Sequence, residues 1–232
     1  MQALIMAGWK PGLNLSIPDS LMDVEGRPFM EYQFELLKDY GIDNIIVCTG
    51  NLGANINYYF YKGQDFGVNL RCTNIEDSML GTGGVIKSVY KYLHDEFYVI
   101  SGDSYFPINY KGIMQYFIKN KNQGLMFMYR NNRFGTNGNV TVENKKVKNF
   151  INTNLNEDIM YTYANTCILN KKIFDFLFLN NHEAFSLEDI FNALIERDEL
   201  LSYEISQQNI ETSTIQGLEK FKEYLNNPVN FL

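Results

Sequence analysis

Leu80-Gly81-Thr82-Gly83-Gly84 and, about one helix and one strand later, Ser101-Gly102-Asp103 are the two stretches that decide the fold. The first is a glycine-rich start of a helix, which can hold a nucleotide. The second places an aspartate at the carboxyl end of an apolar run, where a carboxylate can hold a divalent metal. A doubly wound sheet brings two such strand ends into one crevice. The pair therefore predicts an α/β fold with a ligand site at the ends of its strands.

The first half of the chain alternates between apolar runs and stretches with helical spacing. Pro28 suits a first helical turn, and the aromatic and leucine side chains after it repeat on one helix face. Such alternation predicts a mostly parallel sheet with right-handed crossovers. The expected strands are Ala3–Ala7, Asn44–Thr49, Val68–Cys72, Phe97–Ile100 and Leu125–Tyr129, and the expected helices are Pro28–Tyr40, Asn55–Tyr61 and Gly83–Leu93.

The second half is richer in short β-runs. Asparagine, glycine and lysine turns predict a hairpin within 137–150, and Ser186 with Asp189 three residues later marks a helix start. The other expected elements are strands Tyr163–Leu169 and Leu201–Ile205 and helices Lys171–Leu179, Leu187–Arg197 and Ile215–Leu225. The fold class is therefore α/β: a Rossmann-like, doubly wound, mostly parallel mixed sheet with helices on both faces and a small β-rich second half. We expect residues 1–232 to form a single domain.

Composition and charge limit the possible functions. Hydrophobic residues make up 45% of the 232 residues, enough for a substantial core. The formal net charge of −7 argues against nucleic-acid binding, which needs a basic face. If the ligands are phosphates, a metal or a few local cations must offset this acidic field. No apolar run reaches the roughly 18–20 residues of a membrane span, and the first residues are too short and uncharged for a signal peptide. We expect a cytoplasmic protein with no nucleic-acid or membrane partner.

The cysteines and histidines limit the available chemistry. Cys48, Cys72 and Cys167 are scattered and odd in number, which is typical of free thiols in a reducing compartment. His94 and His182 are the only histidines, and no zinc spacing is present. The sequence therefore argues against a histidine-based metal site and against a Ser-His-Asp triad.

These motifs together resemble the sugar-1-phosphate nucleotidylyltransferases, in particular the small single-domain kind that includes the heptose-1-phosphate guanylyltransferases. The likeness runs nearly end to end. It implies the nucleotide-diphospho-sugar transferase fold, with 1–130 as the nucleotide-binding half and 131–232 as the sugar-binding half. The matching features are the first strand ending at Gly8, Arg27-Pro28-Phe29 at the first long helix, Glu76 shortly before Leu80–Gly84, and Ser101-Gly102-Asp103.

The resemblance also implies a reaction. Members of this family transfer a nucleoside monophosphate from a nucleoside triphosphate to a sugar 1-phosphate and release pyrophosphate. Such chemistry needs positioning, a basic side chain and Mg²⁺ held by carboxylates. The resemblance implies that Asp103 and Glu211 hold Mg²⁺ and that Asn165 contacts the sugar. Lys10 is our candidate for the catalytic cation. Nucleotide binding is implied for Ala7, Gly8, Glu76, Gly81, Thr82, Gly83, Gly84 and Gly102.

The first loop departs from the family pattern. The family carries Gly-Thr-Arg there and, farther on, Pro-Lys. Here residues 8–15 are shorter and contain no arginine, and Asp19 follows Pro18 where the lysine belongs. A carboxylate beside a triphosphate repels the negative phosphates, whereas a lysine would stabilise them. Lys10 can substitute as a point charge, since lysine reaches phosphate without fixed geometry.

The second half departs as well. Asn152 and Thr153 fall near the family's Glu-Lys pair, and neither supplies its charge. Tyr163-Ala164-Asn165 replaces an Asn-Ala-Gly that lines the sugar site. Glu211-Thr212-Ser213 replaces an Asp-Ile-Gly whose aspartate is the second metal ligand. Glutamate can ligate Mg²⁺, but its extra methylene moves the oxygens, and Mg²⁺ is strict about geometry.

Three functional hypotheses follow. The first is an active nucleotidylyltransferase with an altered set of phosphate-binding residues. The second is an impaired relative that binds a nucleotide sugar as a regulator or partner subunit. The third, a dinucleotide-binding oxidoreductase, lacks Gly-x-Gly-x-x-Gly after the first strand and has Cys48-Thr49-Gly50 where an acidic residue would end the second. The first two stay open. The aromatic content of 15%, with Tyr58–Tyr61 in one run, favours a homo-oligomer or pairing with an active relative.

Overall fold

A computed structural model describes most of the chain in two compact units, each assembled from segments that are distant in sequence. The first unit comprises Met1–Ser78, Val99–Lys111 and Gln207–Leu232, and the second comprises Met79–Tyr98 and Gly112–Ser206. The expected division at residue 130, into a nucleotide-binding half and a sugar-binding half, depends on which ligand each half binds. It stays a prediction. The described residues are 1–7, 18–50, 53–60, 66–75, 80–131, 138–151, 159–177, 184–207 and 209–228.

The first unit contains a parallel sheet in the order β5-β4-β1. Its inner strands are almost entirely buried, as in parallel sheets that are covered on both faces. Its strands are β1 (Gln2–Ala7), β4 (Asn44–Thr49), β5 (Asn69–Asn74), the end of β6 (Glu96–Ser101), and the short pairs β2 (Asp23–Val24) with β3 (Arg27–Pro28) and β7 (Ser104–Tyr105) with β13 (Ile210–Glu211). Its helices are the 3₁₀ turn η1 (Asp19–Leu21), α1 (Phe29–Asp39), α2 (Gly53–Phe60) and α8 (Ile215–Asn226).

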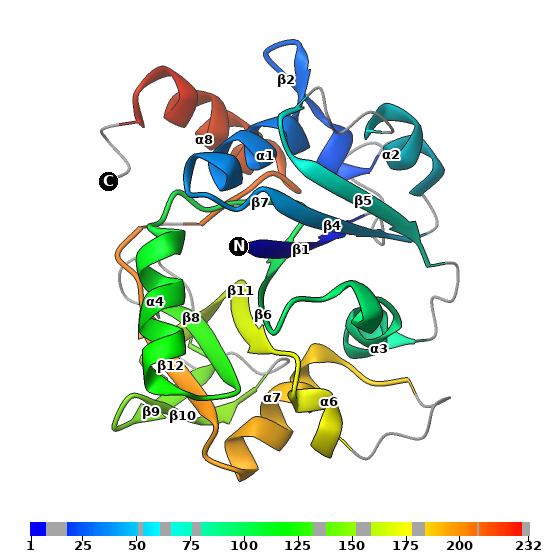
Figure 1. The fold of residues 1–232 in the computed structure, drawn as a ribbon. Helices are drawn as coiled ribbons and strands as arrows, with labels where there is room; N and C mark the ends of the chain where they lie inside the picture. The colour runs from blue at the N-terminus through cyan, green and yellow to red at the C-terminus, as the bar shows by residue number, and fades with distance from the viewer. Residues whose placement is uncertain are drawn as a thin grey trace. The chain divides into compact units, whose positions relative to one another are not determined.

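Helix α8 lies beside α1 and β7 (Figure 1). Contacts between aromatic rings hold it there. The fully buried Phe221 lies with its ring centroid 5.2 Å from that of Phe29, 5.4 Å from Tyr32 and 4.7 Å from Tyr105. Edge-on and tilted ring pairs of this kind add to the free energy of burial. Burial also raises the pKa of Tyr105, so its hydroxyl stays neutral within the cluster.

The second unit contains a mixed sheet in the order β11-β8-β12-β10-β9. The strands β8 and β12 are parallel, and the other neighbours are antiparallel. The strands are β8 (Gly124–Arg130), β9 (Val140–Glu143), β10 (Lys146–Phe150), β11 (Tyr161–Asn170) and β12 (Leu200–Glu204), together with the start of β6. The helices are α3 (Gly81–Ser88), the 3₁₀ turn η3 (Tyr90–Tyr92), most of α4 (Tyr110–Asn120), α6 (Ile173–Phe176) and α7 (Leu187–Glu196).

The α/β fold class is confirmed, and so is the helix start at Ser186. Its side chain accepts a hydrogen bond from the Asp189 N–H while the Asp189 carboxylate accepts from the Ser186 N–H, a complete capping box. Two helices are shorter than expected. The helix expected over Gly83–Leu93 ends at Ser88, because Val89 leaves helical geometry, and it continues as a 3₁₀ turn. The helix expected over Lys171–Leu179 spans Ile173–Phe176, with an extended residue directly after it. Among the described residues, no helix has the length and apolarity needed to cross a bilayer.

Truncation of Phe221 to alanine tests the aromatic contact between α8 and α1. We expect Phe221→Ala to lower the free energy of unfolding by about 3–5 kcal/mol, the usual cost of emptying a fully buried phenylalanine site, as measured by urea denaturation. Ile215→Ala is the matched control, because Ile215 lies on the same helix with its side chain 65% exposed. The control should change the stability by about 0.5 kcal/mol or less. Equal effects of the two variants would contradict the packing described.

Candidate functional site

The turn that carries Asp103 lies directly against the end of β1. The Gly102 N–H donates to the Met6 carbonyl at 2.8 Å. A Cβ atom at Gly102 would lie 2.8 Å from that carbonyl oxygen and 2.9 Å from the Cβ of Ala7, which is closer than real Cβ atoms come. Glycine is therefore required for the close approach, and Ala7 and Gly102 are in contact as the ends of two strands.

Two serine hydroxyls orient the Asp103 carboxylate. Its Oδ1 accepts hydrogen bonds from the Ser101 Oγ at 2.5 Å and from the Ser104 Oγ at 3.3 Å. The side chain is half-buried, and within the described part of the chain its Oδ2 has no hydrogen-bond donor. One carboxylate oxygen is thus held by the protein, and the other is available to a cation.

The second predicted metal ligand, Glu211, reaches the same turn through a two-stranded ladder. Ser104 of β7 pairs with Glu211 of β13, and the backbone N–H and Oγ1 of Thr212 both donate to the Asp103 carbonyl, at 2.8 and 3.1 Å. Thr212 is fully buried, whereas the Glu211 side chain is exposed. Residues more than a hundred positions apart in the sequence are therefore neighbours in the fold.

The donor set at this turn fits Mg²⁺. This ion takes one or two protein carboxylates and completes its shell with water and substrate phosphates, so it does not need a cage of protein ligands. Asp103 in the turn and Glu211 on the strand that pairs with Ser104 are two such carboxylates. The described residues hold no group of three or more potential metal ligands.

A buried glutamine, which the sequence analysis did not identify, clamps the same turn. Gln33 of α1 is 1% exposed, and its Nε2 donates to the Ser101 carbonyl at 2.9 Å and to the Ser104 carbonyl at 2.7 Å. The only signal in the sequence is a polar residue on a helix face that otherwise buries Phe29, Met30 and Phe34. Nothing in that pattern shows which carbonyls it would reach.

The glycine run of the second unit is packed against the segment that precedes α7. The Gly83 and Gly84 N–H groups both donate to the Phe185 carbonyl, at 3.0 and 3.1 Å, and the Phe185 N–H donates to Leu80. A Cβ atom at Gly83 would lie 2.4 Å from the Phe185 ring, and Gly81 has a φ of +67° beside the Phe185 backbone. These glycines are thus explained by close packing. A nucleotide role for Gly81, Thr82, Gly83 and Gly84 stays a prediction.

The residue predicted to contact the sugar, Asn165, lies at an irregularity in β11. The strand register shifts between Tyr163 and Cys167, and Asn165 has a φ of +53°. Glycine adopts that conformation freely and asparagine tolerates it, which explains how Asn165 can stand where the family has glycine. Its neighbour Tyr163 packs edge-on against Phe150 and Phe191, with ring centroids 5.7 and 5.4 Å away. Tyr163 is thus part of an aromatic cluster.

The remaining candidate groups either pair with other side chains or lie outside the described residues. Lys10, Gly8 and Glu76 lie outside them. Arg27 is held by Glu31 at 3.0 Å and by Glu35 at 2.6 Å, and these hydrogen bonds raise the pKa of its guanidinium.

The three cysteines carry no disulfide and are protonated thiols at neutral pH. Burial raises the pKa of Cys48 and Cys167 to about 12 and that of Cys72 to about 11. A cysteine nucleophile needs a lowered pKa. Thiolate chemistry is therefore not supported.

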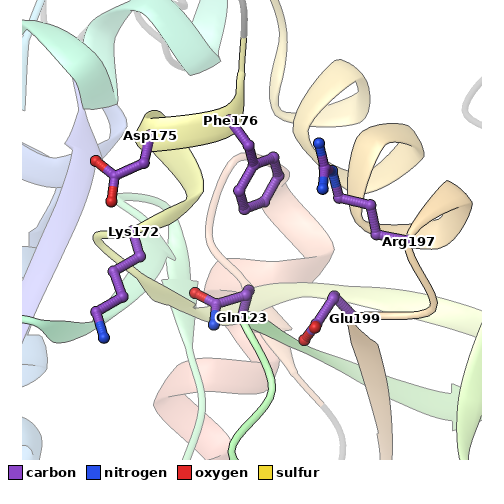
Figure 2. A pocket seen from close by; sticks show the side chains of 6 residues that line it. All are labelled: Gln123, Lys172, Asp175, Phe176, Arg197 and Glu199. Atoms are coloured by element: carbon purple, nitrogen blue, oxygen red, sulfur yellow. The ribbon is translucent and has the colours of Figure 1, made fainter.

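A pocket of about 390 Å³ lies in the second unit, and Figure 2 shows its lining. The guanidinium of Arg197 lies 4.2 Å from the centre of the Phe176 ring, a cation–π contact. None of the predicted site residues lines this pocket, so it gives no support to the nucleotide assignment. The lining residues are Gln123, Lys172, Asp175, Phe176, Arg197 and Glu199.

Comparison with known proteins agrees with the fold. The family described as "Nucleotidyl transferase" matches residues 11–223, so the chain belongs to this family. A D-glycero-alpha-D-manno-heptose 1-phosphate guanylyltransferase of Campylobacter jejuni is 36% identical over 114 residues, which is 47% of this chain and 50% of that protein. A UTP–glucose-1-phosphate uridylyltransferase of Synechocystis is 32% identical over 45% of this chain and 31% of its own length. The chain thus matches half or less of these two relatives.

Longer matches exist at lower identity. The heptose 1-phosphate guanylyltransferase of Aneurinibacillus thermoaerophilus is 27% identical over 82% of this chain and 83% of that protein. The crystal structure of HddC from Yersinia pseudotuberculosis, solved with GMP-PN, superposes with a TM-score of 0.76 at 22% identity over 97% of this chain and 99% of HddC. A Bacillus anthracis structure assigned as a glucose-1-phosphate thymidylyltransferase gives a TM-score of 0.83 at 18% identity, covering 98% and 96% of the two chains. These likenesses confirm the nucleotide-diphospho-sugar transferase fold.

Alanine at neighbouring glycines tests the packing of the glycine run. We expect Gly83→Ala to lower the free energy of unfolding by about 1–3 kcal/mol, because the new methyl would overlap the Phe185 ring and the Ser186 carbonyl. Gly84→Ala is the matched control in the same helix, since its nearest neighbour is the Leu80 side chain at 3.0 Å. Urea denaturation of both variants gives the comparison. A cost for Gly84→Ala that equals or exceeds that of Gly83→Ala would contradict the packing role.

Proposed function

We propose that this protein is a sugar-1-phosphate nucleotidylyltransferase that uses Mg²⁺ and acts in nucleotide-sugar biosynthesis. The observation that carries the proposal is the pair of carboxylates at the turn after β6, where Asp103 lies in the turn and Glu211 lies on β13, which pairs with β7 directly after it. The family and the two heptose 1-phosphate guanylyltransferases among its relatives support it. The substrates are a nucleoside triphosphate and a sugar 1-phosphate, and the products are pyrophosphate and a nucleotide sugar.

The proposed reaction is an in-line displacement at the α-phosphorus. A phosphate oxygen of the sugar 1-phosphate forms the new P–O bond, and the bond to the β-phosphate oxygen breaks, so pyrophosphate leaves with its electron pair. Asp103 and Glu211 would hold Mg²⁺, which neutralises phosphate charge when it is bound. This neutralisation matters in a chain with a net charge of −7.

The remaining roles follow the family resemblance. Gly102 keeps side-chain bulk away from the ends of β1 and β6, so the nucleotide can approach Ala7 and Gly8. Glu76 and the Gly81–Gly84 run would contact the nucleotide and Asn165 the sugar. Lys10 would supply the cation for the transferred phosphate, since Arg27 is committed to Glu31 and Glu35. We also propose a cytoplasmic location and either self-association or pairing with an active relative.

Pyrophosphate release tests the activity. The purified protein would be incubated with Mg²⁺, each common nucleoside triphosphate and a panel of hexose and heptose 1-phosphates, beginning with GTP and a heptose 1-phosphate. We expect release with one matched pair only. Folded protein that is silent across the panel, yet binds a nucleotide sugar, would replace the proposal with the impaired regulator or partner subunit.

Removal of the acid at position 103 tests the metal role. We expect Asp103→Asn to weaken Mn²⁺ binding at least ten-fold, since even groups that only support a metal ligand cost about 10–100-fold. Electron paramagnetic resonance of free Mn²⁺ measures the binding without requiring turnover. Asp198→Asn is the control, because Asp198 is an exposed acid paired with Lys148 at 2.7 Å in the second unit. Unchanged Mn²⁺ affinity in Asp103→Asn would remove the metal assignment.

A further inference from the structure

We propose that Gln33 is a positioning residue that sets the geometry of Asp103 for the metal. The inference rests on the proposed function, because it concerns the metal ligand of that same site. Gln33 lies on α1, far from Asp103 in sequence, and it acts through the backbone of the turn. No contact between Gln33 and a substrate is needed for this role.

The two hydrogen bonds of the Gln33 amide span the turn that carries Asp103. One Nε2 hydrogen is donated to the Ser101 carbonyl at 2.9 Å and the other to the Ser104 carbonyl at 2.7 Å. These carbonyls flank Gly102 and Asp103 on both sides. A single planar amide therefore fixes the two ends of the turn relative to each other.

The same two residues hold the carboxylate. The Ser101 and Ser104 hydroxyls donate to the Asp103 Oδ1, so the residues whose backbones Gln33 fixes are those that orient the Asp103 side chain. A shift of either backbone would move a hydroxyl and rotate the carboxylate. Mg²⁺ tolerates little departure from octahedral geometry, so such a rotation would reduce its affinity.

The side chain of Gln33 lies in a buried, largely apolar environment. It is 1% exposed, and Met30, Phe34 and Leu37 beside it on α1 are fully buried. Among the described residues, its Oε1 is a buried acceptor without a hydrogen-bond partner. The amide orientation is therefore set by the two donated bonds alone. An apolar side chain of similar volume would suit this environment better if packing were the only requirement.

The first experiment removes the two N–H donors of the Gln33 side chain and keeps its volume. Gln33→Met should fold, because methionine adapts to apolar surroundings, and thermal unfolding checks this. We expect its Mn²⁺ affinity, measured by electron paramagnetic resonance of the free ion, to fall about ten-fold. Asn170→Leu is the matched control. It removes a buried amide of the second unit that donates to Glu96 at 3.0 Å, and it should leave Mn²⁺ affinity unchanged.

A double-mutant cycle separates positioning from a general structural effect. If Gln33 acts through Asp103, Gln33→Met should cause no further loss of Mn²⁺ affinity in the Asp103→Asn background, since the energies of coupled residues are not additive. Independent, additive losses would overturn the inference, and so would wild-type affinity in folded Gln33→Met. Wild-type affinity in Asp103→Asn alone would instead overturn the metal role of Asp103, so the two failures are distinguishable.

Discussion

The contact of Gly102 with the end of β1 is the constraint on which the candidate metal site depends. The hydrogen bond from its N–H to Met6, together with the absence of a side chain, lets the chain leave β6 in a tight turn. Any side chain there would push the turn away from Ala7. This close approach fixes the start of the turn that carries Asp103 and leads into β7.

The site is completed from the far end of the chain, and its stability is linked to that of α8. A two-residue strand such as β13 does not persist on its own. It is held by the Thr212 bonds to Asp103 and by α8, which Phe221 anchors in the aromatic cluster. The position of Glu211 at the turn therefore depends on the ladder with β7, on the Thr212 bonds and on the packing of α8.

Local signals in the sequence were sufficient for most elements and for the cap at Ser186, because apolar periodicity and capping chemistry are encoded within a few residues. They also located the strand end at Asp103. They did not reveal the clamp by Gln33 or the docking of Phe185 on the glycine run. Both depend on which backbone groups meet after folding, and a helical pattern contains no information on that. The end of the helix at Ser88 was missed for the same reason, because the apolar periodicity of the sequence continues beyond Ser88.

The packing of the glycine run indicates that other groups would have to balance the charge of a bound triphosphate. The N-terminus of a helix attracts anions through its unpaired N–H groups. In α3, two of these groups, those of Gly83 and Gly84, are already bonded to the Phe185 carbonyl. Less of the helix end is then available to an anion, and Arg27 is neutralised by two glutamates. In the proposed reaction the phosphate charge would therefore be balanced by Lys10 and by a divalent metal at the Asp103 turn.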